Sequence, residues 1–486
     1  MKKFLVLVLS AVMACGTLAG CGGGGKGENT LWIGYQESGY GKAYLEQVIA
    51  NFEAKYPEYD IVINRSDKGF SELAKTEIET DYTKEDLLLI DDIRVYDFAR
   101  AGKLVEISDV YAESFGDDEG NTIDSALLDG AKALGTAEGP DGTVGYYSIS
   151  TGEPIQSLVL NRTVADYYEG LSAWGSKKKF DSVKTVADLN TWVKNIMSLS
   201  ETYPFTYLDG SGSGPVKGYS YPGKYPGYFD SMVSSWWVQY SGYDAYQDFF
   251  AMENADVYKD IGRLKAFEAF ESLDLENTAI DTCINADHIE SQNLFVSGRA
   301  VLIPNGAWIA YESKGSISSW GATIEMVRVP YIDSTHKSTD VLFCGGGGIG
   351  IIPNREDTNV ELAKKFLAYY MNYESSLLSV TMLGSMRPYY REFSNKILED
   401  ASVSEFAEGV LTLRKDSDVL IYDVPKNATG NKWKLVRTGT TSKWRKLAYM
   451  DYVVAGHDAP SVDYQTEISE SAREWDSWLQ INNLTK

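Results

Sequence analysis

LLLIDDIRVYDFARAGKL, residues 87–104, contains the pattern that decides the fold. Four consecutive apolar residues, Leu87 to Ile90, are typical of a strand that is buried on both faces of a parallel sheet. Two aspartates follow, and Val95, Phe98 and Ala99 then repeat at the spacing of one helix face. Gly102 is placed to end that helix. A strand that passes through a polar turn into a helix is the unit of an α/β layer fold.

The same alternation continues on both sides of this stretch. Short apolar runs predict strands, and the helical periodicities between them predict helices. We expect strands at 31–34, 60–64, 157–160, 300–303 and 349–352, and helices around 45–56, 185–196, 261–270, 363–370 and 468–479. A chain of 486 residues is too long for one small core, so two or three domains are expected.

The first twenty residues have the order of a secretory signal peptide. Lys2 and Lys3 precede an apolar run at 4–14, which is too short to span a bilayer. Leu18-Ala-Gly-Cys21 then resembles the bacterial lipobox, in which signal peptidase cuts before a cysteine that carries a diacylglycerol. We therefore expect a mature chain that starts at a lipidated Cys21, on the extracytoplasmic side of the cell membrane. Residues 21–30 would be its glycine-rich tether. The alternative is an ordinary secretory signal with an incidental cysteine.

Composition narrows the class of ligand. The net charge of −24 argues against nucleic acid as a partner. Thirty-three tyrosines and eleven tryptophans contribute most of a 13% aromatic fraction. These side chains pair an apolar face with a polar edge, which suits amphipathic ligands such as sugars, although large domains also bury many aromatics.

Two cysteines lie beyond the leader and Cys21. Cys283 and Cys344 allow either one disulfide or two buried thiols. A pair 61 positions apart is not a disulfide framework, so free thiols are favoured.

Several motifs, in order, resemble the family 1 extracellular solute-binding proteins of ABC sugar importers, whose best-known member binds maltose. The most specific is FVSGRAVLIPNGAW, residues 295–308, which follows the family pattern F-x-x-G-k-a-A-M-x-x-x-G-x-W. The other matches lie at 52–57, 88–92 with 101–104, 159–162, 185–192 and 361–367. Residues 391–486 align with nothing in the family, and the tyrosine-rich loop at 203–246 departs from the maltose-binding pattern.

The resemblance implies an α/β protein of the two-lobed periplasmic-binding-protein type II fold, with hinge-linked α/β lobes. Lobe 1 is expected at 31–152 and 329–376, and lobe 2 at 153–328 and 377–486. Ligand would close the lobes by contacting both of them, and the closed monomer would be recognised by the permease subunits of an ABC transporter.

A sugar needs aromatic faces for its C–H surface and polar side chains for its hydroxyls. In α/β sheets, ligands bind beyond the carboxyl ends of strands. That rule selects Glu37, Tyr40, Asp91 and Arg94, although one of the two adjacent aspartates is expected to cap the following helix.

The resemblance adds further candidates. Glu153 matches a ligand-binding glutamate at the hinge, and one of Trp236 and Trp237 is expected to stack on the ligand. Trp308, just after a strand and Asn305-Gly306, is the strongest stacking candidate, against the alternative that it belongs to the core. Gly346 in an exposed glycine run and Arg387 are weaker candidates.

The sequence contains few of the residues and motifs that an enzymatic site would need. The chain lacks a G-x-S-x-G elbow and an H-E-x-x-H motif, and its three histidines, His288, His336 and His457, are far apart. We expect no catalytic residue, metal or cofactor. A glycosidase needs only two carboxylates and stays open as a remote alternative. The stronger alternative is a binding protein for a non-sugar ligand, such as a polyamine, peptide or small anion. An anion is disfavoured because no basic cluster lies in the candidate loops.

Overall fold

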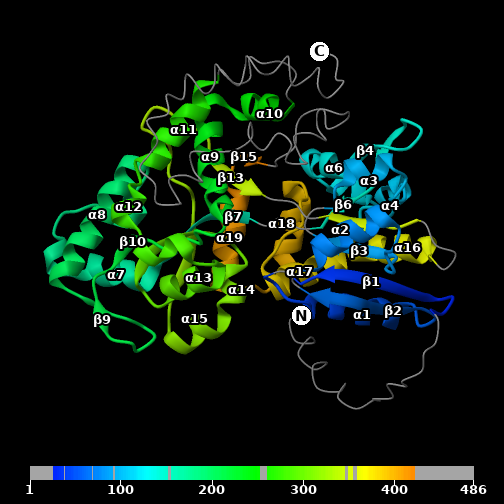
Figure 1. Ribbon diagram of the computed structural model, residues 1–486, viewed down its shortest axis with the longest axis horizontal. Coiled ribbons are helices and arrows are strands. Elements are labelled where there is room, and N and C mark those ends of the chain that lie inside the picture. Colours follow the sequence, from blue (N-terminus) through cyan, green and yellow to red (C-terminus); the bar gives the residue numbers. More distant parts are fainter. Residues whose placement is uncertain are drawn as a thin grey trace.

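The computed structural model describes residues 26–37, 39–67, 69–90, 93–151, 155–251, 260–344, 348–353 and 358–421. Figure 1 shows two groups of strands and helices side by side, with α17, α18 and α19 between them. The predicted leader, Cys21 and the helix expected at 468–479 lie outside the described residues. So do the site candidates Asp91, Glu153 and Gly346.

Lobe 1 is built on a five-stranded sheet whose strand order is β2-β1-β3-β14-β6. Its strands are β1 (Thr30–Gln36), β2 (Asp60–Asp67), β3 (Leu87–Ile90), β6 (Ile149–Ser150) and β14 (Gly348–Ile351). β1 is parallel to β2 and β3, whereas β14 is antiparallel to β3 and β6. The predicted apolar run at 87–90 is therefore a central strand, and all four of its residues are buried.

Helices cover both faces of this sheet. One face packs against a layer that includes α1 (Ala43–Lys55), α16 (Val360–Tyr370) and α17 (Tyr373–Leu383), where Leu31, Val48 and Phe366 share a core. The opposite face packs against α2 (Phe70–Thr80) and α3 (Val95–Arg100). Smaller elements of this lobe are α4 (Ser108–Ala112), α5 (Ile123–Ala126), α6 (Asp129–Gly135), β4 (Thr136–Glu138), β5 (Val144–Tyr146) and α18 (Arg391–Asp400).

Lobe 2 contains a second mixed sheet, in the order β10-β11-β7-β13-β15, with β12 also paired to β7. Its strands are β7 (Ile155–Asn161), β10 (Lys217–Tyr219), β11 (Ala300–Gly306), β12 (Ile324–Val327), β13 (Val341–Cys344) and β15 (Val419–Ile421). Every residue of β11 is buried, as expected for a central strand. The longer helices around this sheet are α7 (Arg162–Gly170), α8 (Val186–Thr202), α9 (Asp230–Ser241), α11 (Ile261–Glu271) and α13 (His288–Val296).

Short elements fill the connections of lobe 2. They are η1 (Ser172–Trp174), η2 (Phe180–Ser182), β8 (Phe205–Thr206), β9 (Ser213–Gly214), η3 (Pro226–Phe229), α10 (Tyr243–Ala251), α12 (Leu275–Thr278), η5 (Asp281–Asn285), α14 (Ile309–Glu312) and α15 (Lys314–Trp320). η3 lies in the tyrosine-rich loop, and α14 follows directly after β11, so both help to position the site described below.

The chain crosses between the two sheets at places that only partly match the predicted boundaries. The first crossing lies between β6 and β7, and the predicted boundary at 152/153 falls in a stretch outside the described residues. The second lies between β13 and β14, because β13 pairs with β7 and β14 pairs with β3. The predicted boundary at 328/329 is therefore too early. The boundary at 376/377 is also wrong, because Val380, Tyr389 and Phe393 pack in the core of lobe 1.

Helix α19 (Glu405–Lys415) touches both parts of the core. Val410 belongs to the cluster that contains lobe 2, and the adjacent Leu411 belongs to the cluster of α1, α16 and α17. Adjacent helical residues point about 100° apart, so one helix can pack on two bodies. The expectation that all of 377–486 belongs to lobe 2 is therefore replaced by a shared segment for 405–415.

The predicted tether is shorter than expected. Lys26 is almost fully buried and pairs with the buried carboxylate of Asp86. The Asn359 side-chain amide donates to the Glu28 carbonyl at 2.9 Å, and β1 begins at Thr30. Residues 26–30 thus follow the surface of lobe 1, with Gly27, Glu28 and Asn29 exposed, so the part of the expected tether before Lys26 stays a prediction.

Thr185-Val-Ala-Asp188, at the start of α8, has the spacing of a capping box, and the structure shows half of that arrangement. The Thr185 hydroxyl accepts a hydrogen bond from the Asp188 amide at 3.2 Å, as expected for an N-cap. Asp188 in turn accepts from the Lys184 amide, one residue before the position that a capping box uses.

Cys283 and Cys344 are both buried free thiols, so the disulfide alternative is excluded. Within the described ranges, no helix combines the length and apolar character needed to cross a membrane.

Candidate ligand-binding site

The two lobes meet where the loop after β1 reaches the helix after β11. β1 ends at Gln36, and its loop carries Gly39 against lobe 2. A Cβ atom on Gly39 would stand 3.0 Å from the Cβ of Trp308 and 2.8 Å from Oε1 of Glu312. Strand ends from both sheets therefore converge at one point, as expected for a ligand site in an α/β protein.

Trp308 is partly exposed, so the alternative that it is a core residue is wrong. Its six-membered ring lies across Gly306, where a Cβ atom would be 2.0 Å from Cζ3. The ring of Tyr228 contacts it edge to face, with centroids 6.2 Å apart and planes at 76°. An indole that is fixed by its neighbours but still partly exposed can offer a face to a ligand.

Tyr40 enters the same region from lobe 1. Its ring centroid is 6.2 Å from that of Tyr311, on α14 of lobe 2. Burial raises the pKa of Tyr40, and the nearby Glu312 carboxylate adds to this. The phenol is therefore a neutral hydrogen-bond donor at physiological pH. Glu37, on the same loop, is partly buried and accepts a long hydrogen bond of 3.4 Å from the Ser66 hydroxyl.

Glu312 and Tyr228 are site residues that the sequence reasoning missed. Oε2 of Glu312 accepts a hydrogen bond from Nε2 of Gln292 at 2.6 Å, which fixes the carboxylate beside Trp308. Burial, reinforced by Glu312, raises the pKa of Tyr228 to about 12. Glu312 follows Trp308 by four residues on a helical turn, a spacing that places two side chains on one face and could have revealed it.

Asn305, one of the predicted ligand contacts, is buried in this structure. It is 1% exposed, and its Oδ1 accepts from the Gly306 amide at 2.8 Å, which shapes the turn after β11. Its Nδ2 is buried without a hydrogen-bond partner among the described residues.

The expectation that Trp236 or Trp237 stacks on the ligand is contradicted, because both indoles are buried. Trp236 is 0% exposed and donates from Nε1 to the Pro330 carbonyl at 2.9 Å. Trp237 donates to the Asp260 carboxylate and packs edge to face on Tyr246, with centroids 5.0 Å apart. Helix α9 packs against α10, α11 and β13, so it is covered on more than one side.

The two arginines of the prediction are engaged elsewhere. Arg94 bridges Glu79 and Asp97 within lobe 1, with its Nη2 2.8 Å from the Asp97 carboxylate. Arg387 is 1% exposed and donates to the Tyr44 hydroxyl at 2.5 Å and to the Thr151 carbonyl. Arg387 therefore ties lobe 1 to the first crossing segment, and a direct ligand contact is not supported for either residue.

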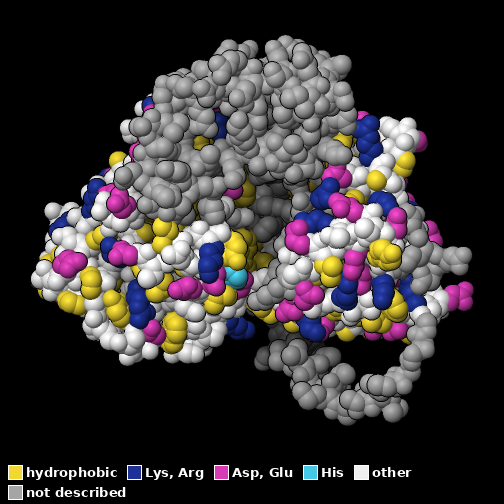
Figure 2. Space-filling model, in the orientation of Figure 1, with side chains coloured by type: hydrophobic (Ala, Val, Ile, Leu, Met, Phe, Trp, Pro, Cys, Tyr) yellow, Lys and Arg dark blue, Asp and Glu magenta, His cyan; other side chains and the backbone are white. Residues whose placement is uncertain are grey.

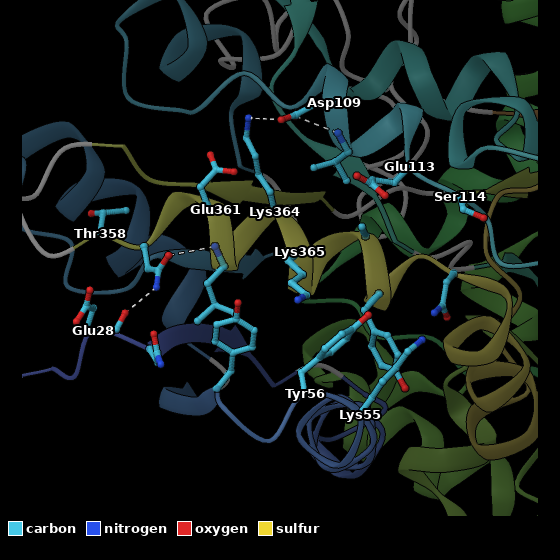
Figure 3. Close-up of a pocket in the computed structure, with 18 of the residues that line it drawn as sticks. Glu28, Lys55, Tyr56, Asp109, Glu113, Ser114, Thr358, Glu361, Lys364 and Lys365 are labelled. Atoms are coloured by element: carbon cyan, nitrogen blue, oxygen red, sulfur yellow. Dashed lines mark hydrogen bonds and ion pairs between the residues drawn. The ribbon is translucent and has the colours of Figure 1, made fainter.

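One cavity adjoins the site and another does not. A cavity of about 970 Å³ is lined by Ala307 and Tyr311 beside the site and by the end of α17. Figure 3 shows a different cavity of about 1000 Å³ in lobe 1, between the N-terminal segment, α1, α4 and α16. There Lys364 pairs with Asp109 at 2.7 Å, and the Lys365 ammonium lies 4.0 Å from the Tyr56 ring centroid. None of the predicted ligand residues lines this second cavity.

The charges of the described surface are mixed. On the face shown in Figure 2, basic and acidic side chains are interspersed on both lobes. Among the described residues, no group of three or more histidine, cysteine, aspartate or glutamate side chains is arranged to hold a metal ion.

The comparisons with known proteins identify the family. Residues 47–390 match the model of the bacterial extracellular solute-binding proteins, and the chain belongs to this family. It is therefore an extracytoplasmic binding protein and not an enzyme, which excludes the glycosidase alternative. No curated protein matches the chain.

Solved structures confirm the two-lobed type II fold. A chitin oligosaccharide-binding protein is 14% identical, with a TM-score of 0.63, covering 92% of this chain and 98% of that one. RafE in complex with raffinose is 14% identical, with a TM-score of 0.58 and coverages of 92% and 99%. MalE from Bdellovibrio bacteriovorus bound to maltotriose is 15% identical, with a TM-score of 0.54 and coverages of 93% and 100%.

Proposed function

We propose that this protein captures a carbohydrate, most simply an oligosaccharide, between its lobes and delivers it to the permease subunits of an ABC importer. The observation that carries the proposal is the partly exposed Trp308 beside the fixed carboxylate of Glu312, at the contact between the lobes. An aromatic face and a carboxylate are the two kinds of partner that a sugar uses.

The transport role follows from where these groups lie. Tyr40 belongs to lobe 1, whereas Trp308 and Glu312 belong to lobe 2. A ligand can contact all three only when the lobes are together, so it stabilises the closed state by its differential contacts. A permease that recognises the closed state then receives only loaded protein.

The ligands of the structural neighbours support the sugar class. Those proteins bind chitin oligosaccharide, raffinose and maltotriose, which are all saccharides. A small anion is a poorer candidate, because Arg94 is neutralised by acids and Arg387 is held in the interior.

Thermal unfolding of the soluble chain, starting at Gly22, tests the ligand class. We expect a homologous series of malto- or chitooligosaccharides to raise the Tm, because a ligand that binds only the folded state stabilises it. Trp308→Ala should remove the shift, whereas Trp320→Ala, which alters another partly exposed tryptophan, should retain it. A shift with polyamines or peptides but with no saccharide would contradict the sugar assignment.

We also propose that Cys21 carries the membrane anchor. The Leu18-Ala-Gly-Cys21 order supports this, as does the short glycine segment between Cys21 and the packed Lys26. Mass spectrometry of the membrane fraction should show a diacylglyceryl group on Cys21. Cys21→Ser should release the protein from membranes, and retention of the variant there would contradict the anchor.

A further inference from the structure

Aromatic rings continue outward from Trp308 along the tyrosine-rich loop. Tyr228 lies on η3, and Tyr225 directly precedes this turn of 3-10 helix. The Tyr228 amide donates to the Tyr225 carbonyl at 3.2 Å, so one turn of backbone joins the two tyrosines. Tyr225 also contributes to the raised pKa of Tyr228, as expected for neighbouring phenols.

A histidine continues the row beyond Tyr225. The ring of His288, at the start of α13, lies with its centroid 5.9 Å from that of Tyr225 and its plane at 57°. Tyr225 is 47% exposed, and His288 is partly exposed. Two aromatic pairs, Trp308–Tyr228 and Tyr225–His288, thus lie on either side of this turn, and the second pair is the more exposed to solvent.

The backbone that carries the outer tyrosine is held in place. The Gly223 amide donates to the Cys283 carbonyl at 2.9 Å, and the Lys224 amide donates to the Ala286 carbonyl at 3.2 Å. A Cβ atom on Gly223 would stand 2.2 Å from the Ile284 carbonyl oxygen, so only glycine permits this close approach. A ligand that reaches Tyr225 therefore meets a preorganised ring and does not have to order a loop.

We propose that Tyr225 and His288 form an outer sugar subsite, which accepts a ring of an oligosaccharide whose inner ring lies at Trp308. This inference rests on the proposed function and makes it more specific, because it predicts a preference for longer glycans. The Tyr225 face stacks on a sugar ring, and the His288 ring nitrogens are within reach of its hydroxyls. A monosaccharide bound at Trp308 does not reach this subsite.

The test is calorimetric titration of the soluble chain with maltooligosaccharides and chitooligosaccharides of one to four units. Tyr225→Ala should weaken the binding of the longer members about threefold to tenfold, the effect of losing one aromatic stack. It should leave the shortest member that binds unchanged. His288→Ala should act in the same direction. Tyr82→Ala, which removes a 76% exposed tyrosine in lobe 1, is the matched control and should change nothing.

The outcomes separate the two proposals. An equal loss for all lengths in Tyr225→Ala, or no loss for any length, would overturn the outer subsite while leaving the sugar assignment intact. Failure of the unmodified chain to bind any saccharide would contradict the proposed function, and the subsite with it. Far-ultraviolet circular dichroism and the Tm of each variant establish that a loss of affinity does not reflect unfolding.

Discussion

Gly39 of lobe 1 packs against Trp308 of lobe 2 so closely that a Cβ atom at position 39 would stand 3.0 Å from the Trp308 Cβ. Tyr40, the next residue, reaches Tyr311 on the same short helix. The contact between the lobes thus depends on a bare backbone position beside the stacking candidate. Approach of the lobes and formation of the ligand site are therefore the same structural event.

We expect Gly39→Val to hinder closure. The added side chain would overlap Trp308 and Glu312, and overpacking of this kind costs about 1–3 kcal/mol. Because the cost falls on the closed state, ligand affinity should fall at least several-fold with little change in the Tm of the free protein. Calorimetry and small-angle scattering check this. Gly315→Ala, where a Cβ atom meets nothing within 4 Å, should bind normally.

Replacement of Glu312 by glutamine should weaken ligand binding without unfolding the protein. The substitution keeps the side-chain shape but converts a charged hydrogen-bond acceptor into a neutral one, which loses roughly 1 kcal/mol for a hydroxyl partner. We expect an affinity about fivefold lower, measured by titration. The exposed Glu361, in the other cavity of lobe 1, supplies the control Glu361→Gln. Equal affinities for the wild-type and Glu312→Gln proteins would remove Glu312 from the site.

The buried pair of Lys26 and Asp86 should be essential for stability. Asp86 is 0% exposed, pairs with Lys26 and accepts from the Trp32 amide at 2.8 Å. Asp86→Ala leaves a buried ammonium and a buried amide without this acceptor, so we expect a loss of about 3–5 kcal/mol in the free energy of unfolding. Urea denaturation measures it. Lys103→Ala, which breaks the more exposed pair with Asp81, should cost less than about 1 kcal/mol.

Acid should weaken the start of helix α8. The hydrogen bond from the Lys178 side chain makes the largest contribution to lowering the pKa of Asp188 below its ordinary value. The hydrogen bond from the Lys184 amide lowers this pKa further. A carboxyl group whose pKa is lower in the folded than in the unfolded protein stabilises the fold at pH values above its unfolded pKa, near 4. This stabilisation is lost as the pH falls through the pKa of the folded protein. Asp188→Asn should therefore lower the Tm at pH 7, and the difference from wild type should shrink towards pH 3. Lys178→Gln should reduce the same pH dependence, and an unchanged Tm profile in both variants would contradict this assignment.

Local patterns predicted the strands and helices well where the periodicity was strong. Leu87–Ile90 became the central β3, and the stretch at 295–308 became the end of α13, the buried β11 and Trp308. These elements depend on spacing within a few residues, which a single sequence displays directly. The chemistry of the site was only partly visible. Trp308 and Tyr40 lie at the lobe contact, whereas Trp236, Trp237 and Asn305 are buried.

Membership of a lobe could not be read from neighbouring residues. β13 and β14 are separated by only three residues, yet they pair with different sheets. Helices α17 and α18 pack in the core of lobe 1, although the family resemblance placed the chain from residue 377 onward in the opposite lobe. Pairing partners lie up to about 260 positions away, and the free energy that selects them comes from burial across the whole domain.

The sequence by itself determined the α/β class, the family resemblance and a supply of aromatic side chains suited to sugars, and it predicted an export signal with a lipid anchor. Each of these can be inferred from patterns among neighbouring residues or from the amino-acid composition. Only the tertiary structure decided that Trp308 is partly exposed whereas Trp236 and Trp237 are buried, that the arginines are already paired or buried, and that Gly39, Trp308 and Glu312 meet. The reason is physical: exposure and proximity depend on how distant segments pack, and side chains of the same type in similar local patterns can lie in the core or at the contact between lobes.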